Sequence, residues 1–272
     1  RRFIKQSNVR LICTTDDPTD DLEYHQKIES LEDFDTTVLP AFRPDKGVEI
    51  GKDSFKGWVE KLSQVWGKPI NDYSDFLAAL EARIDFFHSR GCRLSDHGLD
   101  YVPYREASFD EVDEIFKKAL IGGNISLEEE EKYKTYTLRF FGEQYSKRGW
   151  AMQLHIQAMR NNNTRMFKKL GPDTGFDSIN DNRIAYPLSR FMDSLDKDGN
   201  LPRTILYSLN PTDNFVIGTM LGNFQGDGIP GKIQFGSAWW FNDQKDGMEE
   251  QMKALANLGL LGRFIGMLTD SR

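Results

Sequence analysis

The sequence predicts an α/β protein built as a (β/α)8 barrel that is incomplete in this chain. Seven apolar or β-rich runs each break into a cluster of polar and charged residues. Segments with helical periodicity separate several of these runs, and 272 residues is close to the roughly 250 that one barrel needs. Buried parallel strands are apolar on both faces, and chemistry gathers where they end. The runs cover residues 11–18, 38–45, 92–98, 152–163, 205–211, 233–240 and 266–272.

The segments between these runs carry helical signals. Apolar residues recur at three- and four-residue spacing in 76–89, and a further amphipathic pattern covers 248–261. Ser126 and Glu129 have the spacing of a capping box, which predicts a helix that continues to about residue 149. Because the connection over 101–149 is longer than one crossover between parallel strands needs, we expect it to hold a helical insertion.

Alternation of strands and helices implies parallel strand pairing, and we expect one partial barrel domain over residues 1–272. An open doubly wound sheet is the alternative, but the number of polar strand ends favours the barrel. The seven runs supply seven of eight strands, and residues 1–7 have the character of a helix tail. We therefore expect the chain to be part of a longer protein.

The bulk composition limits the classes of partner. A net charge of -7 and a pI near 5.3 argue against a nucleic acid or an anionic membrane. No run approaches the roughly 20 apolar residues of a membrane helix, so we expect a cytoplasmic protein. Cys13 and Cys92 both lie in apolar runs and are predicted to be buried free thiols rather than a disulfide.

Three strand ends carry candidates for acid–base or metal chemistry. His155 precedes the polar run 160–163, and a neutral imidazole is a good zinc ligand, although a lone strand histidine is also typical of a hydrogen-bonded core. Asp270 ends the last run, and Arg272 lies on the same face if this segment is a strand. The guanidinium can then hold the carboxylate, as it would in a purely structural ion pair. Asp96 ends another run beside a histidine.

Arginines and tryptophans at strand ends suggest how a substrate is held. Arg43, Arg160 and Arg272 each follow an apolar run, and together they predict a pocket for a carboxylate or phosphate, which a guanidinium grips with two hydrogen bonds. A single such arginine is usually only a surface residue. Trp239 and Trp240 have faces that can stack on a sugar ring, although packing in the core or a lid explains them equally well.

Several longer strings resemble the uronate (glucuronate) isomerases, a branch of the amidohydrolase superfamily. The resemblance covers nearly the whole chain and is carried by TTDDP at 14–18, FRPDK at 42–46, SDH at 95–97, LHI at 154–156, RNNN at 160–163, GFDSIND at 175–181, GNFQG at 222–226, GSAWWFND at 236–243 and MLTDSR at 267–272. It implies a metal-binding barrel, with a divalent metal expected to be zinc. The implied activity interconverts D-glucuronate with D-fructuronate and D-galacturonate with D-tagaturonate.

The resemblance also implies roles for individual residues. Asp270 matches an aspartate that reaches the metal and acts as a base, His155 matches a metal-binding histidine, and Asp96 matches an acid on the fourth strand. Trp239 is a candidate for contact with the substrate. The arginines expected to hold the uronate are Arg43, Arg160 and Arg272.

One departure from the family is the absence of its His-x-His pair, which supplies two metal ligands at the first strand. The four histidines of this chain are His25, His88, His97 and His155. The chain therefore resembles strands two to eight of a longer protein, and we expect it to be inactive and weakly stable alone. The alternatives are a metal-dependent hydrolase on the same barrel and a non-catalytic sugar-acid binding protein. The expected partner is a small uronate, and a homo-oligomer is compatible with the sequence.

Overall fold

The computed structural model describes residues 2–226 and 228–267, and the chain falls into two compact units. The first unit comprises 2–96 and 105–150, and the second comprises 97–104, 151–226 and 228–267. In both units parallel strands alternate with helices, so the predicted α/β class is confirmed. Among the described residues no helix is both long enough and apolar enough to span a bilayer.

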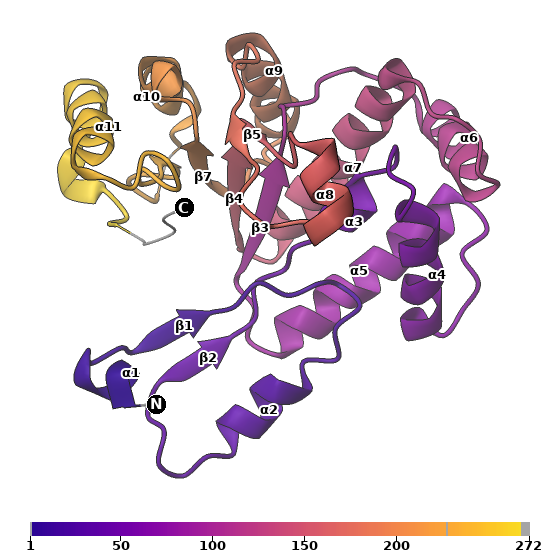
Figure 1. Cartoon of the computed structure of the whole chain (residues 1–272), viewed down its shortest axis with the longest axis horizontal. Helices are drawn as coiled ribbons and strands as arrows, with labels where there is room; N and C mark the ends of the chain where they lie inside the picture. The colour runs from indigo at the N-terminus through magenta and orange to yellow at the C-terminus, as the bar shows by residue number, and fades with distance from the viewer. Residues whose placement is uncertain (1, 227, 268–272) are drawn as a thin grey trace. The chain divides into compact units, whose positions relative to one another are not determined.

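The first unit begins with two parallel strands and their crossover. β1 (Leu11–Cys13) pairs in register with β2 (Thr37–Leu39), and α2 (Glu23–Glu29) connects them and packs against β2 (Figure 1). The short α1 (Arg2–Gln6) precedes them, as the sequence predicts. Phe42 continues the parallel pattern, because it bridges Asp16 on one side and Ser95 on the other.

Helices and aromatic side chains supply most of the core of this unit. Phe76 and Phe116 lie with ring centroids 4.9 Å apart, and Tyr133 stacks on Phe116. The buried Tyr73 hydroxyl pairs with Thr137 Oγ1 at 2.8 Å, so its polar end is satisfied inside the core. The helices are α3 (Asp45–Val48), α4 (Phe55–Trp66), α5 (Tyr73–Ser89), α6 (Phe109–Leu120) and α7 (Leu127–Lys147). The predicted helix at 76–89 and the insertion over 101–149 are thus confirmed.

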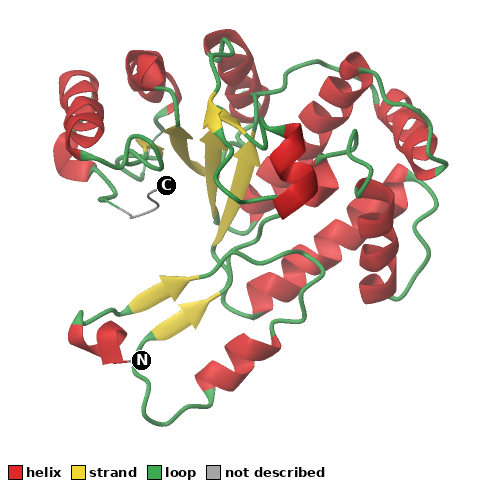
Figure 2. Cartoon of the chain, viewed as in Figure 1, coloured by secondary structure: helices red, strands yellow, loops and turns green. Residues whose placement is uncertain are grey.

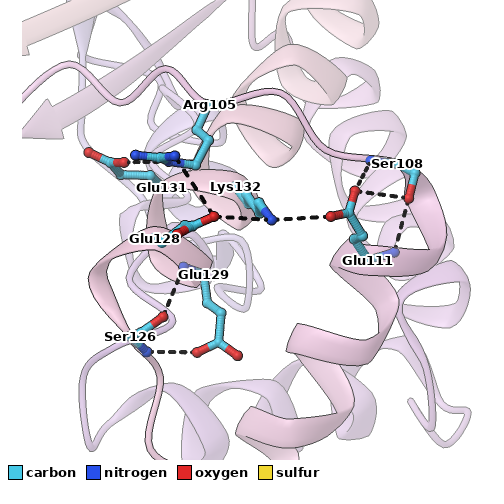
Figure 3. Close-up of polar contacts among 8 residues, drawn as sticks. All are labelled: Arg105, Ser108, Glu111, Ser126, Glu128, Glu129, Glu131 and Lys132. Carbon is cyan, nitrogen blue, oxygen red and sulfur yellow. Dashed lines mark hydrogen bonds and ion pairs between the residues drawn. The ribbon is translucent and has the colours of Figure 1, made fainter.

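Both helices of the insertion begin with a complete capping box (Figure 3). Ser126 Oγ accepts from the Glu129 N–H at 3.2 Å, and Glu129 accepts from the Ser126 N–H at 2.8 Å. Ser108 and Glu111 repeat this arrangement at the start of α6. Lys132 then joins the two helix starts, since its ammonium contacts Glu111 at 3.1 Å as well as a glutamate of its own helix. The insertion is therefore fixed at its helix starts by local polar contacts.

Removal of the Ser126 cap should weaken the first turn of α7. Ser126→Ala leaves the Glu129 N–H without its acceptor, and loss of such a cap typically costs about 1 kcal/mol. We expect amide protection in that turn to fall about fivefold in hydrogen exchange of the full-length protein. Ser189→Ala, in the middle of α9 (Ala185–Asp196), is the matched control and should leave it unchanged. Equal protection in Ser126→Ala would show that the cap contributes nothing.

The same helix start should lose stability in acid. Lys118 donates to the Glu129 carboxylate, as does the Ser126 N–H, and together they lower the pKa of Glu129 from 4.5 to about 2. A carboxyl whose pKa is depressed by folding stabilises the fold above its unfolded pKa. Protection of the first turn of α7 should therefore be full above pH 4.5 and fall as the pH approaches 2. Protection factors measured across this range test the expectation, and Glu129→Gln should remove the pH dependence.

The second unit is built on parallel strands that each lead through a loop to a helix (Figure 2). β4 (Ala151–Ile156), β7 (Arg203–Ser208) and β8 (Ile233–Phe235) are neighbours, and residues 97–99, which end β3 (Leu94–Leu99), lie at the edge beside β4. Its helices are α8 (Thr164–Leu170), α9, α10 (Asn214–Leu221) and α11 (Lys245–Leu258), with 3₁₀ turns η1 (Pro211–Asp213), η2 (Gly222–Phe224) and η3 (Leu261–Arg263).

Some details differ from the sequence predictions. The last predicted helix lies at 245–258 rather than 248–261, and the seventh predicted strand falls mostly on 268–272, outside the described residues. β5 (Ala158–Met159) and β6 (Ser178–Ile179) form a short antiparallel pair that was not predicted. Both cysteines are free and Cys92 is buried, but the prediction for Cys13 was wrong because its side chain is exposed on β1.

Candidate functional site

In the first unit the chain brings Arg43, which follows β2, beside Asp96, which lies within β3. Arg43 follows β2, and the Asp96 N–H donates to Phe42 O at 3.0 Å, which aligns the two segments. Arg43 Nη1 lies 3.2 Å from Asp96 Oδ2, while its Nε donates to Asp45 Oδ2 at 2.7 Å. The Asp96 side chain is only 12% exposed, and the guanidinium offsets the cost of burying its charge.

A second polar cluster in this unit contains a histidine that the sequence prediction missed. Thr14 Oγ1 donates to Asp16 Oδ2 at 2.6 Å and lies 2.8 Å from His25 Nε2. The neighbouring Asp17 accepts from the indole of Trp58 and pairs with Lys46 at 3.0 Å. The TTDDP string marks this strand end in the sequence, but its partner on α2 is eleven residues away and no local spacing reveals it.

In the second unit His155 is held between aromatic rings. It lies on β4, and its ring stacks on Tyr207 with centroids 4.3 Å apart and planes 5° from parallel. Trp239 approaches the same imidazole edge-on at 4.9 Å. Trp239 is 2% exposed and belongs to a buried cluster with Tyr207 and Trp240. His155 and Trp239 are therefore brought together, and Tyr207 is a site residue that the sequence prediction missed.

Arg160 lies beside the second tryptophan of this cluster. Its guanidinium carbon is 4.5 Å from the centroid of the Trp240 ring, and its Nη1 lies 3.3 Å from the exposed Asp173. The φ angles of Gln157, Asn161 and Trp240 are +71°, +56° and +46°, a left-handed conformation that costs energy in residues other than glycine. Such strain is concentrated at functional sites, so the loops that carry Arg160 and Trp240 fit this role.

A buried hydrogen-bonded set holds the ends of β4 and β7 together. Gln157 Nε2 donates to Asp213 Oδ2 at 3.1 Å, and Ser208 Oγ donates to the same oxygen at 2.7 Å. Burial raises the pKa of Asp213, and these two donors offset part of that effect. The set fixes the strand ends from which the residues around His155 project.

The described residues do not by themselves form a metal centre. No group of three histidine, cysteine, aspartate or glutamate side chains within residues 2–226 and 228–267 is arranged to hold a metal ion. Of the two predicted ligands, His155 is placed as described above, whereas Asp270 lies outside the described residues. Arg272, the third predicted arginine, lies outside them as well.

Comparisons with known proteins identify the family to which this chain is similar. The family model for glucuronate isomerase matches residues 1–272. A uronate isomerase of Clostridium acetobutylicum is 64% identical over 100% of this chain and 58% of its own length, and one of Caldicellulosiruptor bescii is 62% identical over 100% and 59%. The solved uronate isomerase of Thermotoga maritima superimposes with a TM-score of 0.92 at 34% identity, covering 100% of this chain and 58% of that one.

A glucuronate isomerase structure from Caulobacter crescentus, with a TM-score of 0.89 over 99% of this chain and 55% of that one, is only 22% identical and supports the fold alone. The chain spans less than two thirds of the length of these relatives. Since the family model covers every residue, the chain belongs to the glucuronate isomerase family.

Proposed function

We propose that the full-length protein is an aldose–ketose isomerase that interconverts D-glucuronate with D-fructuronate and D-galacturonate with D-tagaturonate. The observation that carries the proposal is the match of the glucuronate isomerase family model to residues 1–272. The position of Arg43 just after β2 is compatible with it, because a guanidinium held by neighbouring acids can bind a planar carboxylate.

The chemistry moves a carbonyl from C1 to C2 of the sugar without loss of any atom. A base removes the C2 proton, the C2–H electron pair forms a C1–C2 double bond, and O1 gains a proton. The enediol then loses the O2 proton as C1 gains a proton, which leaves a ketone at C2. We propose that Asp270 takes the C2 proton, since a positioned carboxylate typically contributes about 10²- to 10⁴-fold to such a step.

The other candidate residues bind and orient the substrate or the reacting groups. We propose that Arg43, Arg160 and Arg272 hold the uronate carboxylate and that Trp239 lies against the sugar. Arg43 is already oriented by Asp45, and Arg160 by its contact with Trp240. Preorganised guanidinium groups lose little freedom on binding, which favours capture of a planar carboxylate. Asp96, on β3, would keep the Arg43 guanidinium in place and act in catalysis beside it.

We further propose a divalent metal, zinc, with His155 and Asp270 among its ligands. The described residues alone do not complete such a site, so further ligands must come from elsewhere in the protein. A bound Zn²⁺ would stabilise negative charge on oxygen during the reaction. Zinc suits the donor set, because imidazole and carboxylate are both common zinc ligands.

His155→Gln should lower the metal content of the full-length protein. Loss of an imidazole ligand weakens the metal site. Loss of a residue that only supports a ligand typically lowers metal affinity by about 10- to 100-fold, so we expect loss of the ligand itself to lower zinc affinity by at least about tenfold. Zinc retained after dialysis against a weak chelator, measured by elemental mass spectrometry, tests this without reference to activity. His88→Gln is the control. His88 is not a predicted ligand, and its Nδ1 accepts a hydrogen bond from the Trp150 indole N–H. Equal zinc in the two variants would remove His155 from the ligand set.

The location and partners of the protein follow the same proposal. We propose that it acts in the cytoplasm as one barrel domain on a small sugar acid, without nucleic acid. Two free cysteines suit a reducing compartment, and the net charge of -7 disfavours a polyanionic partner.

The isomerase proposal is tested by incubating the full-length protein with D-glucuronate in deuterated water, with and without added zinc. Proton NMR should show the ketose at constant substrate mass, and deuterium in the product would indicate proton transfer rather than an internal hydride shift. No ketose from D-glucuronate, together with cleavage of an amide or lactone of a sugar acid, would favour the hydrolase instead. Tight uronate binding with no product at any zinc concentration would favour the sugar-acid binding protein.

A further inference from the structure

His155 is stacked on Tyr207 because the two residues are paired across β4 and β7. Their registered positions place both side chains on the same face of the sheet, and the rings lie 4.3 Å apart and 5° from parallel. Trp239 closes a second side of the imidazole at 4.9 Å and 75°. Two aromatic contacts at nearly a right angle therefore define the plane in which the imidazole lies.

A glycine directly after the next strand, β8, makes room for this stack. Phe235 pairs with Leu206, so Gly236 follows on the same level as Tyr207. A Cβ atom at Gly236 would overlap Cδ1 and Cε1 of Tyr207, so the tyrosine ring occupies the space that a side chain there would need. The Gly236 backbone is fixed, because its N–H donates to Leu206 O at 2.8 Å and its carbonyl accepts from Gln251 Nε2 at 2.9 Å.

The far end of the Tyr207 ring is fixed as well. Its hydroxyl donates to Gln153 Oε1 at 3.1 Å, on the same strand as His155, and the side chain is 1% exposed. The ring is thus confined by the Gly236 backbone, the His155 imidazole and the Gln153 amide. Any change that moves or removes the ring changes the plane available to His155.

We propose that Tyr207 is a positioning residue for His155 and that Gly236 is required for this role. The proposal rests on the proposed function, in which His155 acts at the reacting centre. Tyr207 acts through the imidazole and not by contact with the sugar. Because displacements of about 1 Å at a reacting group can lower a rate by about 10²-fold, loss of this support should affect kcat more than KM.

Three variants of the full-length protein separate the ring from its hydroxyl and from its placement. Tyr207→Leu removes the stacked ring and should lower kcat by about 10- to 100-fold, with KM changed by less than about threefold. Tyr207→Phe keeps the ring and should retain kcat within about threefold. Gly236→Ala keeps the tyrosine but displaces its ring, and it should resemble Tyr207→Leu. Phe191→Leu, in the buried face of α9, is the control for a core substitution and should leave kcat unchanged.

An NMR signature of His155 tests the contact without any turnover. Its ring protons lie over the face of Tyr207, so they should resonate upfield in the wild type and in Tyr207→Phe, and lose that shift in Tyr207→Leu and Gly236→Ala. Gly236→Ala should also add little to Tyr207→Leu in kcat, because both act on one ring. The proposal would be overturned if Tyr207→Leu left the His155 shifts unchanged, or if its kcat were no lower than that of Phe191→Leu. A wild type that shifts as expected but forms no ketose would instead overturn the proposed function alone.

Discussion

Replacement of Asp270 by asparagine in the full-length protein is expected to lower kcat for D-glucuronate by about 10²- to 10⁴-fold. An amide has nearly the size of a carboxylic acid, but it does not take a proton from C2 at neutral pH. The loss should therefore fall on kcat, while KM stays within about threefold, because the carboxylate of the substrate is assigned to the arginines. The same variant should stop exchange of the C2 proton with deuterated water, since exchange needs the first step alone.

Two further variants make this expectation specific. Asp270→Glu keeps the carboxylate but moves it by one methylene, so its kcat should lie between those of the wild type and Asp270→Asn. Asp198→Asn, at an exposed turn after α9, is the control for loss of one negative charge and should leave kcat unchanged. If Asp270→Asn retains kcat and C2 proton exchange within about fivefold, another group takes the proton.

The fold class could be predicted from the sequence because each central strand is a short apolar run followed by polar residues, a pattern visible within one segment. Six of the seven apolar runs contain a strand in the described residues, and the parallel pairs follow from the alternation with helices. The capping box at Ser126 was predicted from three-residue spacing alone, and both of its hydrogen bonds are present. The signal for α4 was also available, because its buried residues Phe55, Trp58, Val59 and Leu62 have helical spacing.

Features that depend on pairing between distant segments were missed. β5 and β6 are two residues each, too short for any periodicity, and their pairing brings together residues about twenty positions apart. Cys13 was predicted to be buried because its neighbours in sequence are apolar. Among the described strands, however, β1 pairs with β2 alone, and the Cys13 side chain is exposed. Burial of a strand residue depends on what packs against the strand as well as on the strand's own sequence.

The candidate site was predictable in its residue types and less so in its contacts. Arg43, Asp96 and His155 lie in or just after strands, where polar residues are conspicuous among apolar ones in the sequence. The partners that orient them are not. Tyr207 is 52 positions from His155 and is its partner in the register of β4 and β7, and Gly236, just after β8, leaves room for the Tyr207 ring. Such contacts are set by register between strands, which no single segment encodes.

Replacement of Arg43 distinguishes recognition of the substrate from support of Asp96. The guanidinium contacts both Asp45 and Asp96, so its loss should affect stability as well as binding. Arg43→Lys keeps a positive charge beside these carboxylates but loses the planar fork, and it should raise KM for D-glucuronate by about tenfold with a small change in melting temperature. Arg43→Met removes the charge and should raise KM by about 10- to 100-fold, because a hydrogen bond to a charged group contributes about 1.5–3 kcal/mol.

A comparison with the amide of glucuronic acid isolates the carboxylate. The wild type should prefer the acid strongly, whereas Arg43→Met should lose most of that preference, since the amide offers no negative charge to the guanidinium. Arg190→Met is the matched control, because Arg190 pairs with Asp193 on the exposed surface of α9 at 3.1 Å. If Arg43→Met melts at a lower temperature but keeps the full preference for the acid, Arg43 supports Asp96 and does not bind the substrate. Loss of the preference in Arg43→Lys at an unchanged melting temperature would assign it to recognition of the carboxylate.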